Sequence, residues 1–177
     1  MAALAGPFIA SAALLGAGGA LKVHRPATTA RALRAMGLPG APALVRAGAA
    51  AEVAVAIGAL AWASRPFALA VAASYLAFAG FVLAALQRDV PLSSCGCFGV
   101  QDTPPTPAHV VLNLAAACVA IAVVAHPGGA ALADIAHLGG SLFERVLFVL
   151  LTAIAGWFAY VALTLLPQVL GARKAAA

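Results

Sequence analysis

Apolar residues form five long runs along the chain, and short segments rich in charge, glycine or proline separate the runs. A helix needs roughly 20 apolar residues to cross the hydrocarbon core of a bilayer. Each run is close to that length and holds at most two charged residues. The pattern therefore predicts five transmembrane helices, at residues 4–21, 43–62, 67–86, 108–125 and 146–166.

The first run has one alternative interpretation, a cleaved signal peptide. The sequence ASAA at residues 10–13 resembles a small-residue cleavage site. A signal peptide, however, carries positive charge before its apolar core. The first charge here is Lys22, after the run, so we interpret residues 4–21 as a retained span.

The connections carry structural signals of their own. Within the basic segment 22–42, the sequence ATTARALRAMGL predicts a short helix lying in the membrane interface, with a plain basic loop as the alternative. Residues 87–107 form the longest polar, proline-rich connection. Ser141 and Glu144 have the spacing of a capping box, which predicts that the last helix opens there.

The composition agrees with lipid as the main solvent of the protein. Hydrophobic residues make up 64% of the 177 residues and charged residues 8%, whereas a soluble domain has about 25% charged residues. We expect an all-α integral membrane protein with one membrane domain of four or five spans. The net charge of +5 comes from residues that flank the apolar runs, so we expect a lipid bilayer and no nucleic acid as a partner.

Five spans place the 22–42 and 87–107 connections and the C-terminus on one side of the membrane. That side carries eight of the ten Lys and Arg residues, and the other side carries Arg65 and Arg145. Since positive residues concentrate in cytoplasmic connections, the count predicts that the 87–107 connection is cytoplasmic.

Glu52 is the acidic residue that interrupts an apolar run. A carboxylate within a membrane span is costly and marks a candidate functional site. It lies about 13 Å inside the span at 1.5 Å per residue, and its candidate partners are Lys22, His24 and His109. A purely structural ion pair, or a protonated glutamic acid that packs the bundle, is the alternative.

Three further residues of the fourth run have candidate roles. His109 would exchange a proton with a nearby thiol or would simply lie at the interface where its helix starts. Asn113, one turn later, is expected to form a hydrogen bond to another helix. We expect Cys118 to pack as a small apolar residue. The remaining polar groups, His126, Asp134 and His137, lie on the opposite side and have no recognisable spacing.

Cys95 and Cys97 are separated by Gly96 in the segment that follows the third run. A disulfide between residues i and i+2 closes a very small ring, and strain of that kind makes the bond easier to reduce. The pair therefore suits transient exchange, and Lys22 and His109 would favour its thiolate if they lie near. Two unrelated exposed cysteines, or a Cu(I) or Zn(II) site with His109 as a third ligand, are the alternatives.

Four elements occur in a fixed order: GGALKVHRP at 18–26, AAAEVAVAIGAL at 49–60, SCGCFG at 94–99 and HVVLNLAAA at 109–117. In these the chain resembles the MauE branch of the DoxX-like membrane proteins, the methylamine utilisation family, over roughly residues 4–125. The resemblance implies a bacterial inner-membrane four-helix bundle over residues 1–126, which includes the 87–107 connection, followed by residues 127–177 with a loop, a fifth transmembrane helix and a short basic tail. It also implies that the protein exchanges thiols with thioredoxin-like partners, or with a disulfide-containing client, during maturation of a secreted enzyme.

The resemblance further implies that Cys95 and Cys97 are the redox pair, and it marks Lys22 and Glu52. The fifth span and Asn113, where an arginine is expected, depart from the family pattern. We therefore predict membrane thiol–disulfide exchange by Cys95, Cys97, Lys22, Glu52 and His109, which leaves open whether the protein is an enzyme, a thiol–disulfide oxidoreductase. A Cu(I)- or Zn(II)-binding module and a structural subunit of a larger complex are the alternatives, and no residue pattern indicates a cofactor, quinone included.

Overall fold

A computed structural model of the chain describes residues 2–62, 64–88, 105–125 and 141–164. These ranges contain six helices and no strand. Five of the helices are long and apolar enough to cross a membrane, which confirms the all-α membrane fold. The helices are α1 (Ala2–His24), α2 (Pro26–Ala35), α3 (Pro42–Trp62), α4 (Arg65–Gln87), α5 (Pro107–Ala125) and α7 (Leu142–Thr164).

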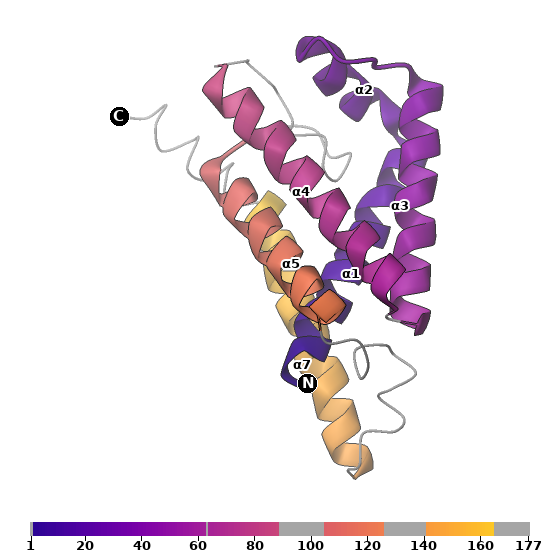
Figure 1. Cartoon of the computed structure of the whole chain (residues 1–177), viewed down its shortest axis with the longest axis vertical. Coiled ribbons are helices and arrows are strands. Elements are labelled where there is room, and N and C mark those ends of the chain that lie inside the picture. Colours follow the sequence, from indigo (N-terminus) through magenta and orange to yellow (C-terminus); the bar gives the residue numbers. More distant parts are fainter. Residues whose placement is uncertain (1, 63, 89–104, 126–140, 165–177) are drawn as a thin grey trace.

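Four of the long helices, α1, α3, α4 and α5, form the bundle, and α7 lies beside it (Figure 1). The most extensive contacts join α4 to α5 and α1 to α3, while α7 packs mainly along α1. Figure 1 also shows that α3 and α4 diverge toward the end of the bundle that α2 occupies. The bundle therefore consists of two tightly packed helix pairs that separate at one end.

Proline and glycine set several helix ends. Helices α2, α3 and α5 begin at a proline, which lacks the N–H that has no partner at a helix start. Helix α2 is followed, two residues after its last residue, by Gly37, whose φ of 74° is the left-handed conformation that glycine adopts without strain. There the Gly37 N–H donates to the Arg34 carbonyl (3.0 Å) and the Leu38 N–H donates to the Leu33 carbonyl (2.9 Å), which completes a Schellman motif.

The main core is built largely from small side chains, because lipid-embedded helices gain stability from close packing. Each of the four bundle helices contributes to it. Its buried members are Phe8, Ala12, Leu15, Ala59, Ala68, Val71, Ala72, Tyr75, Ala117, Ala120 and Val123.

Helix α2 packs against the bundle end where α4 terminates. Ala32 and Met36 form a small buried cluster with Ala85 of α4. Arg31 stays exposed on the other side of α2. The segment is thus an amphipathic helix, as predicted, and the alternative of a plain basic loop is wrong.

Helix α7 opens with the predicted capping box. The Ser141 N–H donates to the Glu144 carboxylate (2.9 Å), and the Glu144 N–H donates to the Ser141 hydroxyl oxygen (3.3 Å). The helix begins at Leu142, earlier than the apolar run alone suggested, because the capping box satisfies its first N–H groups.

Candidate functional site

Lys22 and Glu52 form an ion pair inside the bundle. The Lys22 Nζ lies 2.7 Å from one carboxylate oxygen of Glu52 and 2.5 Å from the other. The Lys22 side chain is 4% exposed and that of Glu52 is 17% exposed. Of the three candidate partners for Glu52, the structure thus selects Lys22. A buried charge is costly without a partner. The ion pair therefore lowers the cost of burying each of the two side chains.

Glycine brings the two charged side chains together. A Cβ on Gly19 of α1 would lie 2.9 Å from the Ala49 carbonyl oxygen and 3.1 Å from the Glu52 Cβ of α3. A side chain at this position would therefore push the helices apart. Close to the same contact, Arg46 of α3 donates a hydrogen bond to the Val23 carbonyl near the end of α1 (3.4 Å). Gly19 therefore allows α1 and α3 to approach closely at the ion pair.

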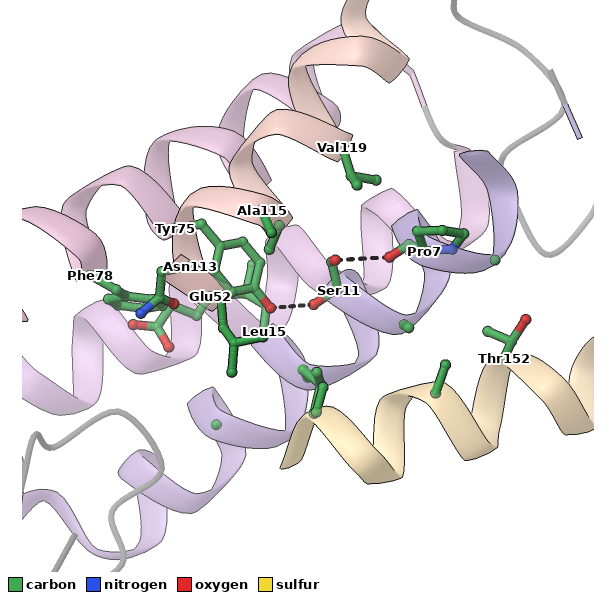
Figure 2. A pocket seen from close by; sticks show the side chains of 18 of the residues that line it. Pro7, Ser11, Leu15, Glu52, Tyr75, Phe78, Asn113, Ala115, Val119 and Thr152 are labelled. Carbon is green, nitrogen blue, oxygen red and sulfur yellow. Dashed lines mark hydrogen bonds between the residues drawn. The ribbon is translucent and has the colours of Figure 1, made fainter. Parts of the chain in front are cut away.

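The ion pair lines an apolar cavity of about 700 Å³ between α1, α4, α5 and α7. Phe78 of α4 borders the same cavity, and the Lys22 Nζ lies 4.6 Å from the centre of its ring, within cation–π range. Figure 2 shows Glu52, Asn113 and Phe78 gathered at one end of this cavity. The site therefore combines one polar end with long apolar walls.

Asn113 and His109 extend the polar region along α5. Asn113 is buried and lines the cavity, and its Nδ2 donates to the His109 carbonyl one turn earlier (2.7 Å). Among the described residues, the hydrogen bond of Asn113 therefore runs along α5 and not to another helix, contrary to the prediction. An asparagine within a helix can satisfy its amide locally by donating to the carbonyl at i−4, and this one does.

His109, in the first turn of α5, is fully buried. Its Nδ1 accepts a hydrogen bond from the Thr106 N–H (3.3 Å) and lies 2.8 Å from the Thr106 hydroxyl. Since a backbone N–H can only donate, Nδ1 is an acceptor and a neutral ring carries its proton on Nε2. The Nε2 atom is buried and has no hydrogen-bond partner among the described residues.

Sequence reasoning missed one polar contact of the cavity wall. The Tyr75 hydroxyl donates to the Ser11 carbonyl (2.6 Å), and the Ser11 hydroxyl donates to the Pro7 carbonyl (2.8 Å; Figure 2). A tyrosine at the centre of an apolar span was the available signal, because a buried tyrosine hydroxyl usually finds a partner. This contact links α4 to α1.

Comparison with known proteins identifies the family. The model of the methylamine utilisation protein MauE family matches residues 1–126. The chain belongs to the MauE family. Searches of curated proteins and of solved structures found no match. The match ends before α7, so the bundle and the ion pair lie within the MauE region. The chain is accordingly a multi-pass membrane protein of this family.

The predicted cysteine pair of this MauE-family chain, Cys95 and Cys97, lies outside the described residues. Within the described ranges, Cys118 is exposed on the outer face of α5. Cys118 was expected to pack as a small apolar residue, and among the described residues it faces outward. A thiol is apolar enough to face lipid, so its position needs no inward partner. His126, Asp134 and His137 also fall outside the described ranges.

The described part of the chain contains no candidate metal-binding site. No group of three His, Cys, Asp or Glu side chains in these ranges is arranged to hold a metal ion. Of the five predicted site residues, the structure brings Lys22 and Glu52 into contact and places His109 next to Asn113, which shares their cavity.

Proposed function

We propose that this MauE-family membrane protein exchanges disulfides through Cys95 and Cys97 with a thioredoxin-like partner or a disulfide-containing client. The sequence carries the central observation: two cysteines one residue apart, within the family region, between two transmembrane helices. Such a pair has little use in packing and suits a bond that forms and breaks readily.

The described helices support the proposal because they place α2 and His109 near the helix ends that flank that segment. Residues 89–104 connect the end of α4 to the start of α5. Helix α2 packs on the end of α4 at Ala85, and His109 lies in the first turn of α5. The helix ends that flank the cysteine segment therefore lie on the side of the bundle that holds α2 and His109.

His109 is the described group best suited to act on a thiol. Its ring is held by Thr106, and its buried Nε2–H has no partner in the described ranges, so it is available to donate to a thiolate sulfur. Lys22 is already neutralised by Glu52 and adds little net charge. We therefore assign His109 to thiolate stabilisation and the Lys22–Glu52 pair to holding α1 against α3 beneath the site.

The exchange itself follows ordinary thiol chemistry. The thiolate of one cysteine attacks a sulfur of the partner's disulfide, which forms a mixed disulfide and releases a partner thiolate. The second cysteine then attacks its neighbour's sulfur in that bond, which closes Cys95–Cys97 and releases the partner as a dithiol. Run in reverse, the same steps oxidise a reduced partner.

The distribution of charge supports a cytoplasmic location for the cysteine segment in a bacterial inner membrane. An impermeant thiol reagent tests this location: it should label Cys95 and Cys97 only after the cells are opened. Labelling in intact cells would place the segment outside and would restrict the partner to that compartment.

Exchange with a reduced or oxidised thioredoxin-like protein tests the function in purified, membrane-reconstituted chain. Cys95→Ser and Cys97→Ser should each lose exchange, and Cys118→Ser should keep it. His109→Gln should slow exchange without preventing it. Full activity in both Cys95→Ser and Cys97→Ser would refute the proposal, and stoichiometric thiolate-bound Cu(I) or Zn(II) would favour a metal-binding function.

A further inference from the structure

The large cavity has the shape and chemistry of a ligand site. Its volume of about 700 Å³ falls within the roughly 300–1,000 Å³ of small-molecule pockets. Its walls are mainly alanine, leucine, valine and phenylalanine from α1, α4, α5 and α7. Its polar end holds Glu52 and Asn113, and Val119 and Thr152 lie toward the other end (Figure 2). The cavity thus matches a molecule with a polar head and an apolar body.

The polar end offers a buried hydrogen-bond donor. Lys22 is 3% exposed and lines the cavity. Its ammonium has three N–H donors, and the two oxygens of Glu52 occupy at most two of them. The remaining donor suits a carbonyl oxygen of a ligand, and Phe78 beside it supplies an aromatic wall for a flat ring.

The depth of this polar end selects among membrane molecules. The Lys22 side chain reaches inward from near the end of α1 to Glu52. Glu52 is ten residues from either end of α3, about 15 Å by helical rise. The charged headgroup of a phospholipid stays at the bilayer surface and cannot follow its chains to that depth without great cost. A quinone with an isoprenoid tail has an uncharged ring that resides within the hydrocarbon core.

We propose that this cavity binds a lipid-soluble quinone, with a ring carbonyl at Lys22 and the tail along α7. The electron transfer, but not the binding, rests on the proposed thiol chemistry. The dithiol of Cys95 and Cys97 loses two electrons and two protons and forms one S–S bond. The quinone takes up both electrons and both protons and becomes the quinol, so the step balances without another reactant.

A second cavity adjoins the first and shares three lining residues with it. It has a volume of about 570 Å³, lies beneath α2 between α3 and α4, and reaches Arg88 at the end of α4. Lys22, Glu52 and Phe78 line both cavities. These three side chains therefore separate the quinone site from a space that extends to the residue directly before segment 89–104.

Photolabelling with an azido-quinone tests the binding. The full-length protein is reconstituted in phosphatidylcholine nanodiscs, labelled, and mapped by peptide mass spectrometry, with decyl-ubiquinone as competitor. Label should appear on the cavity faces of α5 and α7 and disappear with competitor. Label that decyl-ubiquinone does not displace, or that lysophosphatidylcholine displaces equally well, would overturn the proposal.

Two neighbouring residues of α7 provide the matched variants. Ala155 lines the cavity, whereas Ile154 is exposed and lines none of the cavities described above. A phenylalanine at 155 adds a ring to the cavity and should weaken quinone binding at least about tenfold, which equals 1.4 kcal/mol. Ile154→Phe should bind as the parent does. If Ala155→Phe is not monodisperse, Ala159→Phe on the same wall replaces it, and unchanged binding in the folded variant would refute the site.

Cysteine variants distinguish the quinone site from the proposed thiol exchange. A Cys95→Ser/Cys97→Ser protein should bind quinone like the parent, because the cavity contains neither residue. Thiol exchange in a protein that does not bind quinone would refute the quinone site and would leave the proposed function standing. Quinone binding in a protein without thiol exchange would leave the site and remove the electron transfer.

Discussion

Helices α1 and α7 have the same length, 23 residues, and a similar apolar character, but they have opposite positions in the protein. Half of the apolar span of α1 is buried inside the protein, and none of the apolar span of α7 is. Helix α1 carries small residues where it meets α3, whereas α7 exposes Phe143, Trp157 and Phe158. In lipid, apolarity alone gives a helix no reason to be buried, so small residues and polar partners decide which helix is central.

The largest expected effect comes from breaking the ion pair that joins α1 to α3. Lys22→Met leaves the Glu52 carboxylate buried without its partner, which should lower the free energy of unfolding by about 3–5 kcal/mol. Unfolding in sodium dodecyl sulfate, followed by circular dichroism, measures the loss.

A compensating variant controls for the ion-pair test. Lys22→Met/Glu52→Gln removes both charges and should recover most of the stability, since the remaining cost is about that of one unsatisfied buried amide, 1–3 kcal/mol. A Lys22→Met protein that unfolds like the parent would show that the pair contributes nothing to the fold.

A phenylalanine on each helix gives the most direct test of the comparison. Phe8 of α1 is completely buried, and Phe158 of α7 is 67% exposed. Phe8→Ala should lower the free energy of unfolding by about 3–5 kcal/mol because it leaves a cavity in the core. Phe158→Ala should change it by no more than about 0.5 kcal/mol. The same unfolding titration measures both, and equal losses would mean that α7 is as central as α1.

The smallest expected effect concerns the close approach of α1 to α3. Gly19→Ala places a Cβ against the Ala49 carbonyl and Glu52, which should cost about 1–3 kcal/mol by overpacking. Gly80→Ala is the control, because nothing lies within 4 Å of its added Cβ, and it should be neutral or stabilising by up to about 1 kcal/mol. Equal stability of the two variants would contradict the tight α1–α3 contact.

Much of the fold follows directly from the sequence. The five apolar runs predict the long helices, and the capping box at Ser141 and Glu144 predicts the start of α7 correctly. Glu52, the one carboxylate within the predicted spans, is also recognisable as a candidate site, because a charge in lipid is costly. These features are predictable because they depend on the length of each apolar run, on local backbone hydrogen bonding and on the free-energy cost of a charge in an apolar solvent.

Contacts between helices were harder to predict. The sequence offered Lys22, His24 and His109 as partners of Glu52, and the structure selected Lys22 because Gly19 lets α1 approach α3 at that level. Cys118 was expected to pack as a small apolar residue, and it is exposed on α5 among the described residues. A span that is apolar on every side carries little information on which face turns inward.

The sequence by itself determined the number of spans, the side of the membrane that each connection shares and the residues too polar to be left alone in lipid. Only the tertiary structure decided the rotation of each helix, and with it the Lys22–Glu52 contact, the hidden ring of His109 and the cavity that Asn113 lines. The physical reason is that bilayer and protein interior are equally apolar, so the inward face is set by packing between helices and not by the periodicity of any one of them.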